Sequence, residues 1–122
     1  RQPLTICDVG HNVGGLSITM KQLAEIPCRQ LRMVFGMVSD KDIEHIIPLL
    51  PKEALFYVCQ ANIERAIPAA DLAAMLSQHG LSCKICGNVL DAFQTAEADA
   101  SPEDIIFVGG SCFVVGNLLE NL

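Results

Sequence analysis

The chain has 122 residues, a formal net charge of -6 and 51% hydrophobic residues. This length and composition suffice for one hydrophobic core, so we expect a single domain over residues 1–122. The acidic balance and the scattered basic residues argue against nucleic-acid binding, and no apolar run approaches the roughly 20 residues of a membrane-spanning helix.

Strand-like and helix-like segments alternate along the chain. The expected strands are LTICDV (4–9), LRMVFG (31–36), ALFYVC (54–59), SCKIC (82–86) and DIIFVG (104–109). The expected helices run from about Gly14 to Ile26, Lys41 to Leu50, Ala69 to His79, about Asn88 to Ala98, and Ser111 to the end. This alternation predicts an α/β, Rossmann-like three-layer domain, with helices on both faces of a mostly parallel sheet and with strands covered on both sides.

In such a fold, ligands bind at the carboxyl ends of the strands, so the segments that follow the strands are the candidate site. The first of them, "DVGHNVGGLS", has the spacing G-x-x-x-x-G of a phosphate-binding P-loop from Gly10, but Leu16 replaces the required lysine. An ordinary strand-to-helix turn is therefore favoured over an autonomous phosphate site. The polar residues Asp8, His11 and Asn12 remain as candidates for another role.

Two further segments allow two interpretations each. In "GMVSDKD", Ser39 or Asp40 either caps the next helix, or Lys41 meets an anionic ligand. In "VGGSCFVVG", Ser111 is either a helix cap or part of a carboxylate site at the start of the last helix.

The six cysteines could form disulfides, but several lie in apolar strand-like runs, which favours buried free thiols in a reducing cytoplasm. His79, Cys83 and Cys86 resemble part of a zinc site. No second ligand pair accompanies them, and residues three apart on a strand point to opposite faces, so we expect core thiols and no metal.

Four motifs together resemble one family, the folylpolyglutamate and dihydrofolate synthases of the Mur ligase superfamily, over essentially the whole chain. They are "DVGHN", "VFGMVSDKD", "QANIERAIPAADL" and "IIFVGGSCFVVGNLL", in that order. The resemblance is to the carboxy-terminal domain of these enzymes.

This resemblance implies an ATP-dependent ligase that adds L-glutamate to dihydropteroate or to the γ-carboxylate of a folate through an acyl phosphate. It implies that Asp8 hydrogen-bonds the nucleotide, with His11 and Asn12 beside it, and that Lys41 and Ser111 approach the glutamate or the phosphorylated carboxylate. Lys41 and His11 are the implied catalytic residues. The P-loop and the Mg²⁺ ligands are expected in an amino-terminal ATPase domain of the same chain, in a cytoplasmic monomer.

Because the sequence starts at Arg1 and enters a strand at once, we expect a fragment that hydrolyses no ATP by itself. Two alternatives remain: a free-standing, non-catalytic α/β binding module, and a ligase domain that acts on a peptidoglycan precursor.

Overall fold

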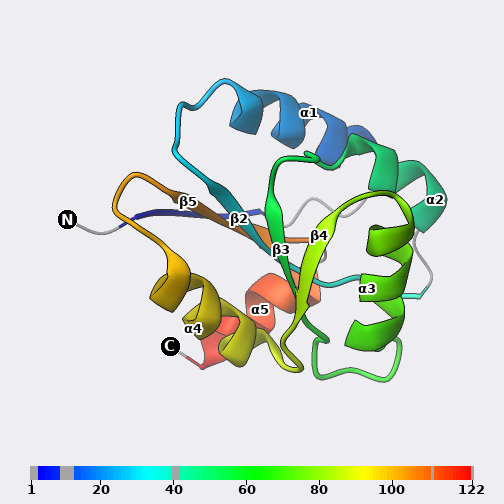
Figure 1. Cartoon of the computed structure of the whole chain (residues 1–122). Coiled ribbons are helices and arrows are strands. Elements are labelled where there is room, and N and C mark those ends of the chain that lie inside the picture. Colours follow the sequence, from blue (N-terminus) through cyan, green and yellow to red (C-terminus); the bar gives the residue numbers. More distant parts are fainter. Residues whose placement is uncertain (1–2, 9–12, 40–41, 111, 122) are drawn as a thin grey trace.

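A computed structural model of the chain describes residues 3–8, 13–39, 42–110 and 112–121. Strands and helices alternate along it, as the sequence predicts (Figure 1). The strands are β1 (Leu4–Cys7), β2 (Leu31–Phe35), β3 (Leu55–Val58), β4 (Ser82–Ile85) and β5 (Ile105–Gly109). The helices are α1 (Val13–Ala24), α2 (Ile43–Ile46), α3 (Ala69–Gln78), α4 (Val89–Asp99) and α5 (Cys112–Glu120), with a 3₁₀ turn, η1 (Ile47–Leu49), directly after α2.

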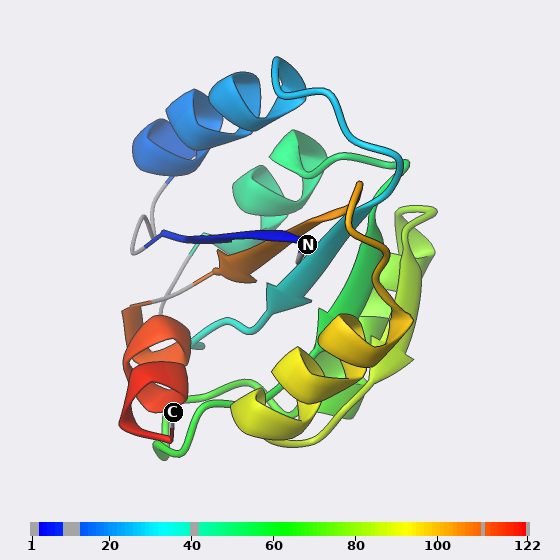
Figure 2. The same cartoon turned by 90° about the vertical axis from the view of Figure 1, so that its left-hand side faces the viewer.

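The five strands form one sheet in the order β1-β5-β2-β3-β4, and every neighbouring pair is parallel. Figure 2 shows α1 and α2 above this sheet and α4 and α5 below it. The predicted α/β fold, with a parallel sheet between two layers of helices, is therefore confirmed.

Each face of the sheet has its own hydrophobic core. On one face, Leu16 of α1 and Leu72 of α3 pack in a cluster with Phe35 and Phe56. On the other face, the cluster is formed by side chains from α4 and α5 with alternate residues of the same strands, among them Tyr57. Successive residues of a strand point to opposite faces, which explains why β2, β3 and β5 are apolar throughout.

The expectation that all strands are covered on both sides is wrong for the two edge strands. Three of the four residues of β1 are exposed, and Leu4 keeps 53% of its surface accessible. In β4, Ile85 is 61% exposed. A strand at the edge of a sheet has a neighbour on one side alone, so it is less covered than a central strand.

The helix expected over residues 41–50 is also wrong in length. Of the described residues in this range, 42–50, only Ile43–Ile46 is α-helical, and η1 follows with a hydrogen bond from the Leu50 amide to the Ile47 carbonyl at 3.1 Å. Pro48 has no N–H group to continue the α-helical pattern, and the chain therefore tightens into a 3₁₀ turn.

Because all strands are parallel, their carboxyl ends meet at one edge of the sheet. The helix that follows β3 lies on the first face, whereas the helix that follows β4 lies on the second face. The loop after β3 and the loop after β4 therefore turn toward opposite faces of the sheet. Open α/β sheets form ligand-binding crevices between neighbouring strands whose loops turn to opposite faces in this way.

Within the ranges that the structure describes, no helix is long and apolar enough to cross a membrane.

Candidate functional site

Asp8 lies at the carboxyl end of β1, where the sequence predicts a functional residue. Its backbone amide donates to the Val108 carbonyl at 3.0 Å, so the pairing of β1 with β5 extends beyond β1 itself. The Thr19 hydroxyl of α1 lies 3.3 Å from Asp8 Oδ2 and 3.1 Å from the Gly15 carbonyl oxygen. The half-buried carboxylate is thus held between the end of β1 and the first turns of α1.

Glycines let the ends of four strands approach closely at this edge. A Cβ atom on Gly109 would lie 3.3 Å from the Asp8 carbonyl oxygen. A Cβ on Gly110 would lie 2.3 Å from the Gly36 carbonyl oxygen. A Cβ on Gly36 would, in turn, lie 2.8 Å from the Cys59 carbonyl oxygen. The backbone of Gly110 also has a φ of +101°, which L-residues with a side chain rarely adopt. The turn after β5 is therefore built against the neighbouring strand ends.

Four predicted site residues, His11, Asn12, Lys41 and Ser111, lie outside the described residues. Their assignment stays a prediction. Among the described residues, the Asp8 carbonyl lies close to Gly109, because a Cβ on Gly109 would be 3.3 Å from its oxygen.

The segment after β2 does not begin α2 in the way that its sequence predicts. The residue that caps α2 is Asp42, rather than Ser39 or Asp40, and it makes no side-chain hydrogen bond to the helix backbone. Its carboxylate instead accepts a hydrogen bond from His45 Nδ1 at 2.7 Å. This hydrogen bond raises the pKa of the exposed His45 imidazole. The Ser39 amide, in turn, donates to the Arg65 carbonyl at 2.8 Å.

Arg65 is a candidate that the sequence analysis did not single out. The segment after β3 folds back so that Val38 and Ala66 form an antiparallel bridge. The exposed Arg65 guanidinium then lies 5.3 Å from the ring centroid of Phe113, in the first turn of α5. The sequence could have pointed to this residue, because Arg65 is the one arginine in the five segments that follow the expected strands.

The expectation of buried thiols holds only in part. Cys59 is buried, and burial raises the pKa of its thiol to about 12, but Cys7 and Cys28 are exposed. Both of these lie at the periphery, Cys7 on the edge strand β1. Cys83 packs against the hydrophobic cluster of one face and Cys86 against that of the other, so these two side chains point apart as predicted. Among the residues that the structure describes, no group of three or more His, Cys, Asp and Glu residues could hold a metal ion.

Comparison with known proteins gives a consistent result. Residues 1–112 match the family model described as "Mur ligase, glutamate ligase domain". The chain is 30% identical, over 115 residues, to a probable bifunctional folylpolyglutamate synthase/dihydropteroate synthase of Haloferax volcanii. This alignment covers 93% of the chain but 14% of the relative.

Solved structures resemble the chain over nearly its whole length. Escherichia coli FolC in complex with DHPP and ADP superposes with a TM-score of 0.86 at 28% identity, over 96% of this chain and 28% of that one. A bifunctional folylpolyglutamate synthase/dihydrofolate synthase with Mn, AMPPNP and L-glutamate bound superposes with a TM-score of 0.82 at 28% identity, over 99% and 29%. The chain therefore spans less than a third of the length of each of these proteins.

Proposed function

Because the chain belongs to the Mur ligase family of glutamate ligase domains, we propose that it is the carboxy-terminal domain of an ATP-dependent folate ligase. The ligase adds L-glutamate to dihydropteroate, to the γ-carboxylate of a folate, or to both. One observation carries the proposal: all four family-like motifs include the carboxyl end of a strand or the loop that follows it. These strands are β1, β2, β3 and β5, so the motifs meet at one edge of the sheet.

The proposed reaction has two steps. The terminal phosphoryl group of ATP passes to the acceptor carboxylate, which yields ADP and an acyl phosphate. The amine of glutamate then attacks the acyl carbon, loses a proton and displaces phosphate. Both steps depend on positioning and on charge compensation, because the reacting groups carry several negative charges.

We assign residues of this chain to these tasks as part of the proposal. Asp8 hydrogen-bonds the nucleotide, with His11 and Asn12 beside it. Lys41 compensates charge on the phosphorylated carboxylate, and Ser111 holds a carboxylate of the incoming glutamate at the start of α5. The position of Asp8 supports the first assignment, because it directly follows β1 at the carboxyl end of the parallel sheet.

The partners follow from the same proposal. A central ATPase domain, amino-terminal to this one in the same chain, supplies the P-loop and the Mg²⁺ ligands, and the enzyme acts as a monomer. The chain acts in the cytoplasm, where a reducing environment keeps thiols free, and Cys7, Cys28, Cys59, Cys83 and Cys86 are free in the structure.

The test compares this chain with the protein that its complete reading frame encodes. Incorporation of labelled glutamate is measured with ATP and one acceptor at a time: dihydropteroate, tetrahydrofolate or a muramyl precursor. We expect ATP-dependent incorporation into a folate acceptor by the longer protein and none by the 122-residue chain. Incorporation into the muramyl acceptor alone would favour the peptidoglycan alternative. A reading frame that starts at Arg1 would favour the non-catalytic module.

A further inference from the structure

A polar pocket of about 460 Å³ opens between α4 and α5, next to the loops that follow β3 and β4. We call it the asparagine pocket, after the polar side chains that line it. These are Gln60, Asn62, Asn88, Asp91, Asn117 and Asn121. It lies where the chain turns toward opposite faces after β3 and after β4, which is the type of crevice where open α/β sheets bind ligands.

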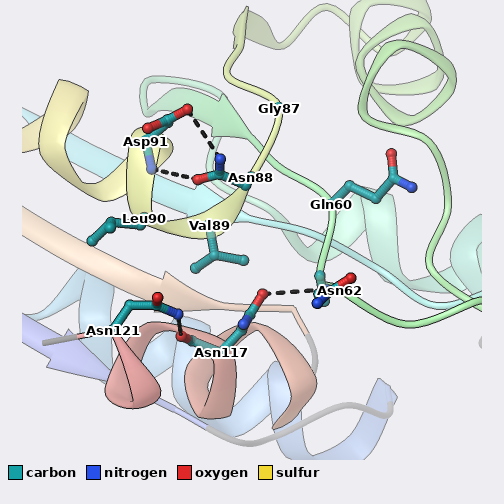
Figure 3. Close-up of a pocket in the computed structure, with 10 residues that line it drawn as sticks. Gln60, Asn62, Gly87, Asn88, Val89, Leu90, Asp91, Asn117 and Asn121 are labelled. Carbon is teal, nitrogen blue, oxygen red and sulfur yellow. Dashed lines mark hydrogen bonds between the residues drawn. The ribbon is translucent and has the colours of Figure 1, made fainter.

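Figure 3 shows how these side chains are arranged. Asn88 and Asp91, at the start of α4, lie on one side, and Asn117 and Asn121 of the α5 region lie on the other, with Asn62 beside them. Val89 and Leu90 lie between the two sides and give the pocket an apolar wall.

Internal hydrogen bonds fix one amide of the pocket. Asn117 Oδ1 accepts from the Asn62 backbone amide at 3.2 Å, and the Asn117 carbonyl accepts from Asn121 Nδ2 at 2.7 Å. Because its oxygen is engaged, Asn117 keeps its Nδ2 group as a donor. Within the described part of the chain, no hydrogen bond uses Asn117 Nδ2, Asn121 Oδ1 or the Asn62 side chain. The pocket thus offers both donors and acceptors.

The charge of the pocket limits the ligand that it can bind. Asp91 is its one charged lining residue, and no lysine or arginine lines it within the described chain. Asn88 caps α4, because its Oδ1 accepts from the Asp91 amide at 2.8 Å and its Nδ2 donates to Asp91 Oδ2 at 3.1 Å. A phosphate or carboxylate ligand would meet the Asp91 carboxylate and no lysine or arginine among the described lining residues, and the start of α4 is already capped by Asn88, so an anion is disfavoured.

We propose that the asparagine pocket binds a neutral planar heterocycle whose edge carries adjacent hydrogen-bond donors and acceptors. The Asn62 carboxamide, which makes no side-chain hydrogen bond in the described part of the chain, presents one N–H donor beside one C=O acceptor in a plane. Asparagine and glutamine pair with the edge of a purine in this way. A pocket of this volume with an apolar wall accommodates a ring system of that size. Asp8, the one described residue that is assigned to the nucleotide, does not line this pocket, and the proposal goes beyond the ligase function.

A purine nucleoside and a pterin share this chemistry, and titrations of the ¹⁵N-labelled 122-residue chain separate them. The probes are adenosine, 6-hydroxymethylpterin, ribose and ATP. We expect saturable shifts of the amide signals of Asn62, Asn117 and Asn121 with one or both heterocycles, at about millimolar affinity or tighter. Ribose is expected to cause no such shifts, and ATP is expected to bind more weakly than adenosine.

Three variants test whether these side chains make the contacts. Asn117→Asp keeps the oxygen that accepts from Asn62 but removes the Nδ2 donor, and Asn62→Ala removes a side chain that has no hydrogen bond in the described structure. Each substitution is expected to weaken the binding of the heterocycle by about two- to tenfold. Gln94→Glu is the matched control, because it makes the same amide-to-acid change at an exposed residue of α4 that does not line the pocket.

The proposal is overturned if neither heterocycle shifts these signals, if ribose binds as well as adenosine, or if ATP binds more tightly than adenosine. Equal affinities of the heterocycle for the wild type, Asn117→Asp and Asn62→Ala, in variants whose melting points show that they are folded, would also overturn it. None of these measurements requires ligase activity. A failed glutamate assay and a failed titration are therefore distinguishable.

Discussion

Arg32 of β2 and Asp104, the residue before β5, form an ion pair inside the molecule, with Arg32 Nε 2.9 Å from Asp104 Oδ2. The Asp104 side chain is fully buried and that of Arg32 is 10% exposed. The same carboxylate accepts from the backbone amide of Ser101 at 3.0 Å. A buried charge needs such partners, because an unpaired ion in an apolar interior is strongly destabilising. This pair therefore links β2 to the turn that leads into β5.

The first prediction concerns the stability of the chain in acid. Burial by itself raises the pKa of Asp104, but the hydrogen bonds from Ser101, Arg32 and Arg29 outweigh it and lower this pKa from 3.8 to about 2. The folded state therefore binds the proton less readily than the unfolded state. The stabilisation from this carboxyl, about 2 kcal/mol, is present above pH 4 and is lost as the pH falls toward 2. Urea denaturation at a series of pH values measures it.

The variant Asp104→Asn separates this contribution from other acid effects. It leaves Arg32 without its buried partner, so we expect a loss of roughly 3 to 5 kcal/mol at neutral pH and a flatter pH dependence below pH 4. Glu103→Gln, at the exposed neighbouring position, is the control and should change neither. An unchanged slope between pH 4 and 2 in Asp104→Asn would contradict the assignment.

Tyr57 gives a second pH-dependent signal, because it is the single tyrosine of a chain that has no tryptophan. Burial and the hydrogen bond that its hydroxyl donates to Asp99 raise the pKa of Tyr57 to about 12, although Arg32 opposes the shift. The unfolded chain loses this proton near pH 10, so folding becomes less favourable as the pH rises from 10 to 12. Tyrosinate absorbance should stay low near pH 10 while circular dichroism shows a folded chain.

Tyr57→Phe tests the hydrogen bonds of the same hydroxyl. The variant removes the acceptor of Arg32 Nη1, at 2.8 Å, and the donor to Asp99, at 2.9 Å. We expect a loss of about 1 to 3 kcal/mol in the free energy of unfolding, because a buried donor then lacks its partner. A variant as stable as the wild type would show that water replaces the hydroxyl at no cost.

The order of five strands and five helices was predictable from the sequence, because strands that are buried on both faces read as short apolar runs. The exposure of β1 and β4 was not predictable from their own residues. Leu4 and Ile85 are apolar but exposed, and only the sheet order makes their strands the edges. The end of α2, by contrast, could have been read from Pro48.

The candidate site was predictable to a similar degree. Asp8 could be placed at the carboxyl edge, because the residue after a parallel strand always lies there. Arg65 could not be placed beside Phe113, because that contact depends on the bridge between Val38 and Ala66, and neither residue marks such pairing in the sequence.

The glycine turn after β5 leads to a third prediction. Gly110→Ala places a Cβ 2.3 Å from the Gly36 carbonyl oxygen, at a φ of +101°. We expect a loss of roughly 1 to 3 kcal/mol from backbone strain alone, with a further loss from the clash. Gly116→Ala, inside α5 with nothing within 4 Å of the added Cβ, is the control and should gain roughly 0.5 to 1 kcal/mol. Thermal melts should show a lower melting point for Gly110→Ala and a higher one for Gly116→Ala. Equal shifts in the two variants would contradict the role given to the backbone of Gly110.

The last prediction concerns Ser111 and Lys41 in the proposed full-length ligase. If the start of α5 holds a glutamate carboxylate, Ser111→Ala removes one hydrogen bond to a charged group, worth roughly 1.5 to 3 kcal/mol. The Michaelis constant for glutamate should then rise by about tenfold to a hundredfold, with a similar dependence on ATP. Lys41→Ala should lower the turnover as well, because it removes a positive charge where the phosphorylated carboxylate is expected. If both residues serve only the helix starts, their loss costs about 1 kcal/mol of stability, and the folded enzyme keeps its kinetics. Steady-state kinetics with glutamate and ATP varied separately, together with melts of each variant, distinguish the two roles. A lower melting point with an unaltered glutamate dependence would leave both residues as structural.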